Sequence, residues 1–409
     1  MRSTLKIGLT CRATSLLALL GTVGCGESSD SKQASGNDGP VYATMTNVYN
    51  DEDRTVYVAL TESLDEDIDF DEAYELAGVG NMEAIGGNLL LSSGESPLIT
   101  KYQVSPPADW QEQGSLSFAN FPLEDNANFF YQYLVDEHHM YMPFDGYKRI
   151  VWDPTELEIL EVKEDSALEP TLDSLTLTAG GNRSGVRYEG AAMQPFFYKD
   201  EDWLEFAPSS YIAVYDPDTH EETKVIEAPC PGLAVPSLDE AGNTYFSTWD
   251  YSPLKALYGD GPAPCVARIT PDHELDEAFT NDFTAWTGGR YSINFRYIRD
   301  GWGLADVLYP EELEDVAFSG PFDPTVREQL WETGPWRVWR IDLRNQRAEP
   351  FDGIDVAGLG WSNVQVDDRS FLFVPFDEYT RTRVYELDAE GRASTHTDLL
   401  GDASWMRVR

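Results

Sequence analysis

Long apolar runs and basic residues are both scarce in this 409-residue sequence. The first apolar stretch, residues 13–23, is shorter than the roughly 20 residues that a membrane-spanning helix needs. Lys and Arg number 29 against 72 Asp and Glu, which gives a formal net charge of −43. Because an anionic surface repels nucleic acid and anionic lipid headgroups, we expect no DNA or RNA partner and no membrane contact beyond an anchor.

Histidine and cysteine, the usual ligands of zinc, are rare as well, with five and four copies. No Cys-x-x-Cys spacing occurs, and the adjacent His138 and His139 point to opposite faces if they lie in a strand. The Gly-x-Ser-x-Gly motif of serine hydrolases is also missing. These absences favour a binding protein over an enzyme, although they leave the enzyme class open, and they name no cofactor.

The N-terminus has the layout of a secretory leader. Arg2, Lys6 and Arg12 precede or begin the apolar stretch, which ends in small residues before Cys25. The sequence "TVGC" at 22–25 resembles the lipobox of bacterial lipoproteins, although Thr22 stands where that family usually has Leu. The resemblance implies a signal peptide over residues 1–24 and a lipid on Cys25; the alternative is an ordinary secreted protein.

A polar segment follows the leader. Residues 25–40 are rich in Ser, Gly and Asn and contain no large apolar side chain after Cys25, a composition typical of a flexible tether. The residue after Cys25 is Gly26 and not the Asp that marks inner-membrane retention in enteric lipoproteins. We therefore expect an exported monomer anchored in the outer membrane of a Gram-negative envelope, with one folded domain over residues 41–409.

One phrase recurs through that domain every 45 to 60 residues or so: a turn, an apolar or aromatic strand, a polar turn and a second strand. It is visible at 86–104, 136–154, 209–229, 239–253, 336–351 and 367–391. Repeated hairpins at this period predict an all-β fold, a β-propeller, because stacked blades bury faces that a single blade leaves exposed. The alternative fold is a pair of two-sheet sandwiches.

Six blades are visible, and a seventh is predicted to join residues 54–63 near the N-terminus with 404–409 at the C-terminus. A six-bladed ring is the alternative count. Short inserts are predicted at 64–76, as a loop or helix, and at 308–318 and 323–332, as helices. Inserts gathered on one face of a scaffold often build its binding site.

Two cysteines remain in the domain after the leader and Cys25 are set aside, namely Cys230 and Cys265. An even pair in an oxidising compartment predicts a disulfide, with two buried free thiols as the alternative.

Two clusters are candidate sites. Asp65, Asp67, Asp69 and Asp71 alternate along one segment, so their oxygens are candidate calcium ligands, although an acidic solvated loop is the alternative. The second cluster interleaves arginine with aromatic residues, which suits an aromatic or anionic ligand. Its members are Arg290, Arg296, Arg299, Trp286, Tyr291 and Trp302. Packing between blades is the alternative role for these six residues.

The phrases "GNLLLSS" (87–93), "GNTYFST" (242–248) and "VYELDAEG" (384–391) resemble those of propeller lipoproteins from Gram-negative envelopes, including myxobacterial ones associated with siderophore systems. The resemblance spans roughly residues 41–409 and implies an envelope-anchored protein that holds a small molecule, such as a ferric siderophore, or an envelope protein partner. The alternatives are a propeller enzyme, such as a metal-dependent lactonase or another hydrolase, and a structural or adhesive surface module.

Overall fold

The computed structural model describes most of the chain from residue 39 onward. The described ranges are 39–49, 54–66, 68–70, 73–78, 80–93, 96–106, 108–123, 132–164, 167–180, 185–188, 190–249, 253–279, 283–313, 318, 322–332 and 334–409. The chain divides into Met1–Asn37 and a compact unit, Asp38–Arg409, which is the unit considered below. The predicted leader, Cys25 and nearly all of the tether lie outside the described residues.

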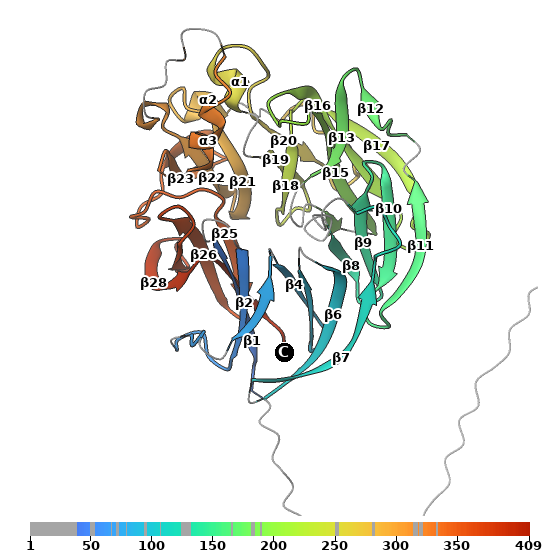
Figure 1. The fold of residues 1–409 in the computed structure, drawn as a ribbon. Helices are drawn as coiled ribbons and strands as arrows, with labels where there is room; N and C mark the ends of the chain where they lie inside the picture. Colours follow the sequence, from blue (N-terminus) through green and yellow to red (C-terminus); the bar gives the residue numbers. More distant parts are fainter. Residues whose placement is uncertain are drawn as a thin grey trace, which may run out of the picture. The chain divides into compact units, whose positions relative to one another are not determined.

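The described residues form seven antiparallel sheets arranged as the blades of a ring (Figure 1). The predicted seven-bladed β-propeller is therefore confirmed. From the innermost strand outward, blade 1 contains β29 (Asp402–Arg407), β1 (Tyr42–Tyr49), β2 (Arg54–Thr61) and β3 (Tyr74–Ala77). Blade 2 contains β4 (Gly80–Ile85), β5 (Asn88–Ser93), β6 (Ser96–Ser105) and β7 (Asp109–Ser117). Blade 3 contains β8 (Tyr133–Asp136), β9 (His139–Phe144), β10 (Lys148–Asp153) and β11 (Glu158–Glu164).

The other four blades follow in chain order. Blade 4 contains β12 (Thr171–Leu172), β13 (Leu175–Ala179), β14 (Val186–Tyr188), β15 (Ala191–Lys199), β16 (Phe206–Tyr215) and β17 (Glu222–Ala228), with β13 and β14 both paired to β15. Blade 5 contains β18 (Leu233–Leu238), β19 (Thr244–Thr248) and β20 (Val266–Ile269). Blade 6 contains β21 (Ser292–Arg299), β22 (Trp302–Leu308), β23 (Trp336–Asp342) and β24 (Arg347–Pro350). Blade 7 contains β25 (Ser362–Val366), β26 (Arg369–Phe376), β27 (Arg381–Leu387) and β28 (Ala393–Leu400).

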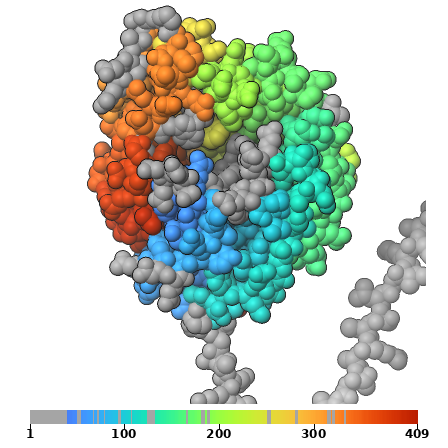
Figure 2. Space-filling view, in the orientation of Figure 1, coloured from blue at the N-terminus to red at the C-terminus, as the bar shows by residue number. Residues whose placement is uncertain are grey.

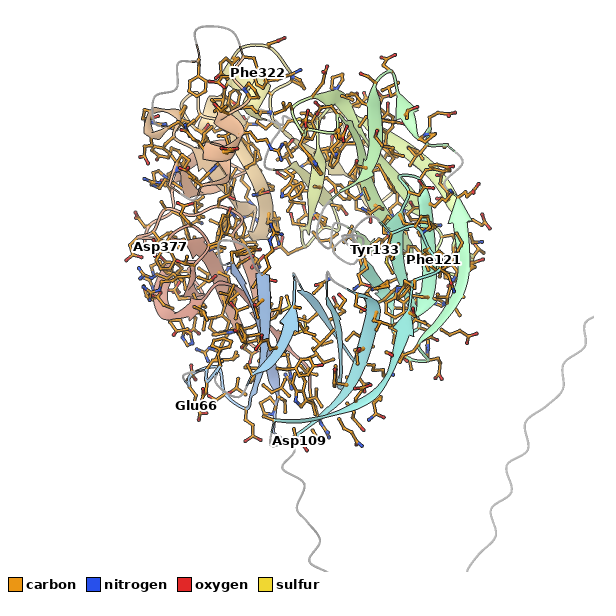
Figure 3. The ribbon with its side chains drawn as sticks, in the orientation of Figure 1. Glu66, Asp109, Phe121, Tyr133, Phe322 and Asp377 are labelled. Atoms are coloured by element: carbon orange, nitrogen blue, oxygen red, sulfur yellow. A yellow bond between two sulfur atoms is a disulfide. The ribbon has the colours of Figure 1, made fainter. Side chains whose placement is uncertain are left out.

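The burial of each strand follows its place in the blade. All seven residues of β22 are buried, because a middle strand packs against neighbouring blades on both faces. The outermost strand β11 instead alternates between exposed and half-buried residues. Side chains fill the space between adjacent sheets (Figure 3), so the core is a series of layers between blades.

The ring closes by pairing strands from the two ends of the domain. Strand β29 pairs with β1 from Tyr42 opposite Arg407 to Asn47 opposite Asp402. Residues 54–63 and 404–409 therefore share a blade as predicted, with β1 lying between them. In Figure 2 the red C-terminal blade 7 lies against the blue N-terminal strands.

The helical inserts gather on one face of the ring. Helix α1 (Pro253–Leu257) lies between the second and third strands of blade 5, and η2 (Pro310–Glu312) and α3 (Val326–Trp331) occupy the same connection in blade 6. Helix α2 (Phe283–Trp286) lies in the link between blades 5 and 6. In a four-stranded antiparallel blade, both kinds of connection emerge where the innermost strand begins.

The predicted helical inserts at 308–318 and 323–332 are confirmed by η2 and α3. The described residues of 64–76 contain no helix, and this segment runs into the outermost strand β3 of blade 1. Cys230 and Cys265 form the predicted disulfide, which ties the entry of blade 5 to its strand β20.

Candidate functional site

A cavity of about 820 Å³ opens on the face that carries the helical inserts. Pockets that hold small organic molecules usually measure about 300–1,000 Å³. Its lining comes from the beginnings of the innermost strands of blades 5, 6, 7 and 1 and from the connections beside them. The lining residues are Tyr49, Arg54, Ala234, Val235, Trp249, Asn294, Arg296, Arg327, Glu328, Glu332, Gly360, Trp361, Pro375, Glu378, Tyr379 and Asp402.

Exposure separates the floor of this cavity from its rim. The carboxylates Glu328, Glu332 and Glu378 are exposed and therefore well solvated, so they form an acidic rim. Deeper in the lining, Asn294 and Trp361 are buried, and the charged groups Arg296 and Asp402 are partly buried. Three partly buried charged side chains therefore line the cavity, namely Arg296, Arg327 and Asp402.

A β-bulge in β21 positions Arg296. The register passes from Ile293 opposite Asp306 to Arg296 opposite Leu304, so two residues of β21 face one residue of β22. Asn294 lies in this bulge with φ of 53°, in the left-handed region that asparagine tolerates better than most residues. Bulges of this kind redirect side chains and are frequent beside functional sites.

Hydrogen bonds from neighbouring blades hold the bulged strand. Asn294 Nδ2 donates to Asp306 Oδ2 over 3.0 Å, and the same carboxylate oxygen accepts the Gly360 N–H of blade 7 over 3.1 Å. On the other side, the Phe295 N–H donates to the hydroxyl of Ser247 in blade 5 over 2.8 Å. The fully buried Asp306 therefore joins blade 6 to the entry of Trp361 at the cavity floor.

The turn between β26 and β27 forms another part of the wall; its first residue, Asp377, is labelled in Figure 3. Asp377, Glu378 and Tyr379 have φ of 51°, 54° and 60°, three successive left-handed residues without a glycine. This conformation costs roughly 1–2 kcal/mol per non-glycine residue. Backbone strain of this kind clusters at ligand clamps and active sites, where the surrounding structure enforces it.

The same turn fixes the backbone around Asp402. The Gly401 N–H donates to the Thr380 carbonyl over 2.7 Å, and the Thr382 hydroxyl donates to the Gly401 carbonyl over 2.7 Å. Gly401 has φ of 64°, and a Cβ there would overlap the carbonyl oxygen of Asn47. Only glycine fits this turn, which sets Asp402 at the start of the innermost strand of blade 1.

Burial dominates the electrostatics of the wall. It raises the pKa of Asp402 to about 6, because removal from water disfavours the charged carboxylate. Burial also raises the pKa of Tyr49 to about 12, with a smaller contribution from the negative charge of Asp402, while Arg54 acts in the opposite direction. The Arg54 guanidinium lies 5.4 Å from the centre of the Tyr49 ring.

Of the six residues in the predicted arginine and aromatic cluster, Arg296 lines this cavity. Its guanidinium carbon lies 5.7 Å from the centre of the Trp361 ring, which is a cation–π geometry. Arg299 lies near the other end of β21, where it donates to the Asp388 carbonyl. The two arginines are three residues apart, yet one faces the cavity and the other holds a turn of blade 7.

The other four residues of the cluster do not line the cavity. Arg290 forms two hydrogen bonds with Glu311, at 2.7 and 2.6 Å. The Tyr291 hydroxyl donates to the Ala256 carbonyl over 3.1 Å. Trp286 packs against Phe283, and Trp302 is 5 % exposed within the core between blades 6 and 7. The structure therefore gives these four residues packing or ion-pair contacts.

The predicted calcium ligands are only partly described. Asp67 and Asp71 lie outside the described residues, and Asp65 forms an ion pair with Arg369 over 2.9 Å. Asp69 lies within the described residues, and its side chain is exposed. Among the described residues, no three His, Cys, Asp or Glu side chains lie close enough together to hold a metal ion. The calcium site stays a prediction.

Sequence reasoning missed Asp402, Trp361 and the β26–β27 turn. The signals that point to them are weak, because in "LLGDAS" (399–404) and "GLGWS" (358–362) a glycine directly before the cavity residue is the main feature. Such glycines also occur at ordinary turns. These positions differ from ordinary turns because residues from different blades lie together at the cavity, and the sequence alone does not show which segments meet.

Comparison with known proteins adds information on the fold. No protein-family model and no curated protein matches this chain. A solved structure of a periplasmic gluconolactonase, PpgL from Pseudomonas aeruginosa, matches with a TM-score of 0.52 and 11 % identity, over 90 % of this chain and 99 % of that chain. The structure of apo AztD from Citrobacter koseri matches over the same shares with 11 % identity and a TM-score of 0.40. The likeness to PpgL supports the propeller fold.

None of the described helices is both long enough and apolar enough to span a membrane.

Proposed function

We propose that this chain is an exported binding protein that holds a small organic molecule in the cavity formed by blades 5, 6, 7 and 1. The observation that carries this proposal is the combination of a cavity of about 820 Å³ with a partly buried arginine and several aromatic rings. The ligand class that suits it has an anionic group for Arg296 and a flat or apolar part for the rings.

Two features support recognition of such a ligand. The Arg296 guanidinium offers charge-assisted hydrogen bonds, which are about twice as strong as those between neutral groups. The aromatic side chains Tyr49, Trp249, Trp361 and Tyr379 come from blades 1, 5 and 7 and thus surround the cavity from several directions. Ring faces bind flat or apolar groups with little loss of side-chain entropy.

The proposed setting is the bacterial envelope, with a lipid on Cys25 as anchor and residues 25–40 as tether. A ferric siderophore with aromatic donor groups belongs to the proposed ligand class, since it combines negative charge with rings. Delivery of the ligand to an envelope protein partner is part of the same proposal.

A thermal-shift screen of the full chain tests the proposal. The probes are ferric siderophores, aromatic carboxylates and aromatic dipeptides, with calcium and EDTA as ion controls. A ligand that binds the native state raises the melting temperature with its concentration. We expect a saturable rise with at least one anionic aromatic probe. The absence of any shift across these probes, or chemical turnover of the bound probe, would contradict a binding function.

A pair of variants then locates the site. Arg296→Met removes one of the positive charges that line the cavity. We expect binding of the best probe to weaken by about 10- to 100-fold, because hydrogen bonds to charged groups contribute about 1.5–3 kcal/mol. Arg299→Met, on the same strand but outside the cavity lining, is the matched control and should change affinity less than about twofold. Calorimetric titration of both variants measures this difference. Equal losses would place the ligand elsewhere.

A further inference from the structure

The Asp402 carboxylate has no described side chain that stabilises its charge. By contrast, the partly buried Asp398 carboxylate has the Arg383 guanidinium at 2.7 Å. Among the described residues, no hydrogen bond or ion pair reaches the Asp402 side chain. Burial is the cause of its raised pKa, with no compensating contribution from a cation.

The groups that face Asp402 do not supply the missing positive charge. Tyr49 on β1 lies close enough for the Asp402 charge to raise its pKa, and a phenol carries no charge at neutral pH. Arg54 on β2 is directed to the Tyr49 ring. Glu378, on the turn between β26 and β27, is itself acidic. A partly buried carboxylate without a counter-ion destabilises the native state, and a cation that binds beside it reduces this destabilisation.

Backbone contacts fix the position of the Asp402 carboxylate in the cavity wall. The strained β26–β27 turn, the left-handed Gly401 and the pairing of β29 with β1 all fix the start of β29. The arrangement is preorganised, which reduces the entropy that binding would otherwise cost.

A positive charge stands near the same cavity floor, two blades away in the ring. Arg296 belongs to the innermost strand of blade 6, Asp402 to that of blade 1, and the entry of blade 7 with Trp361 lies between them in the ring order. One cavity is therefore lined by a cationic group from blade 6 and an anionic group from blade 1, with blade 7 between them in the ring order.

We propose that the cavity selects organic zwitterions, with a ligand ammonium group paired to Asp402, a ligand carboxylate bound by Arg296 and an aromatic or apolar part packed on the partly exposed ring of Trp249. This inference rests on the proposed binding function and narrows it to molecules of the amino acid and short-peptide type. The volume of about 820 Å³ accommodates more than one aromatic residue.

The test uses a matched set of probes, namely the dipeptide Trp-Phe, its N-acetyl derivative and its C-terminal amide. Acetylation removes the ammonium charge and amidation removes the carboxylate, while both rings stay. Calorimetric titration of the full chain at pH 7.5 should give at least tenfold weaker binding for each derivative than for the free dipeptide.

The variant Asp402→Asn keeps the shape of the side chain and removes its charge. We expect it to bind the free dipeptide as weakly as the wild-type chain binds the acetylated one, so that acetylation no longer matters. Asp368→Asn, an exposed aspartate in the turn between β25 and β26, is the control and should leave all three affinities within twofold.

The outcomes separate the two proposals. Equal binding of free and acetylated dipeptide overturns the ammonium pairing and leaves the binding function intact. The same holds if purely anionic aromatic probes bind and none of the dipeptides does, or if calcium alone saturates Asp402 and displaces the dipeptide. Failure of every probe, anionic and zwitterionic alike, overturns the binding function itself.

Discussion

At the scale of single residues, the charged Asp402 carboxylate lowers the free energy of unfolding, and the rest of the fold compensates for this loss of stability. Its carboxyl has a pKa of about 6 in the folded chain, against about 3.9 in an unfolded one. The native state thus holds the proton more tightly. The loss of stability caused by the charged carboxylate is absent below about pH 4, grows between about pH 4 and 6, and is fully present above that range.

Asp402→Asn should therefore stabilise the chain at neutral pH by up to about 3 kcal/mol, because each unit of pKa shift corresponds to about 1.4 kcal/mol. The advantage should shrink as the pH falls from about 6 to 4, where the wild-type carboxyl becomes protonated. Melting temperatures of variant and wild type across pH 4–8 measure this. An advantage of the same size at every pH, or a loss of stability at pH 7, would show that Asp402 is not a desolvated charge.

Residue chemistry in the sequence pointed to one residue that lines the cavity, Arg296. The interleaved arginines and aromatics predicted a ligand near Arg296, and Arg296 lines the cavity. Its neighbour Arg299 has the same surroundings in sequence but lies near the other end of the strand. The bulge at Asn294 that turns Arg296 towards the cavity depends on hydroxyl and carboxylate partners on β19 and β22, so the local pattern could not distinguish the two arginines.

At the scale of elements, the turns at the cavity are shaped by contacts between blades. Gly401 connects β28 to β29 with a left-handed backbone that has no room for a side chain. Gly360, just before β25, is also left-handed, with φ of 76°, but nothing lies within 4 Å of the position where its Cβ would be. Substitution of Gly360 would therefore introduce backbone strain alone, whereas substitution of Gly401 would introduce both backbone strain and steric overlap.

Gly360→Ala should cost roughly 1–2 kcal/mol, the strain of a left-handed alanine. Gly401→Ala should cost clearly more, because the new methyl group meets the Thr46 hydroxyl at 2.6 Å in addition to the Asn47 carbonyl. Denaturant unfolding of both variants gives the comparison. Equal costs would mean that the β28–β29 turn is not as tightly packed as described.

The strands themselves were predictable because apolar hairpins recur along the chain, and a middle strand such as β22 must be apolar on both faces. Pro310 and the two glutamates after it indicated the insert that contains η2, and residues 323–332 were predicted as a second short helical insert, where α3 lies. Helices α1 and α2 are only five and four residues long, too short for a periodic pattern to show.

At the scale of the whole molecule, the fold depends on closure of the ring between blade 7 and blade 1. Trp405 on β29 is 2 % exposed and packs edge-on against Phe371 and Phe373 of blade 7, with ring centres 5.2 and 5.1 Å away. This seam holds together strands from the two ends of the domain.

Trp405→Ala should destabilise the chain by about 3–5 kcal/mol, the usual cost of emptying a buried tryptophan site. Leu400→Ala, in the preceding strand, should change stability by no more than about 0.5 kcal/mol because Leu400 is 47 % exposed. Thermal unfolding of the two variants checks the closure. Similar small effects would indicate that the seam contributes little to stability.

The blade number and the closure could be predicted because six hairpins recur along the sequence. The seventh blade was then expected to form from strands at the two ends of the domain. The position of the cavity could not be predicted, because it arises where blades 5, 6, 7 and 1 bring short, separate segments together. The fold could be predicted because each blade repeats the same local pattern of strands and turns. The site could not, because it depends on which blades lie next to one another in the ring.

A crystal structure of the full chain soaked with the dipeptide Trp-Phe at saturation is the most direct measurement of what this cavity does. We expect the dipeptide between Arg296 and Asp402, with its carboxylate on the guanidinium, its ammonium group on the Asp402 carboxylate and an indole or phenyl ring on Trp249. A dipeptide bound outside this cavity, or a cavity that stays empty at a concentration that saturates binding in solution, would contradict the assignment of the site.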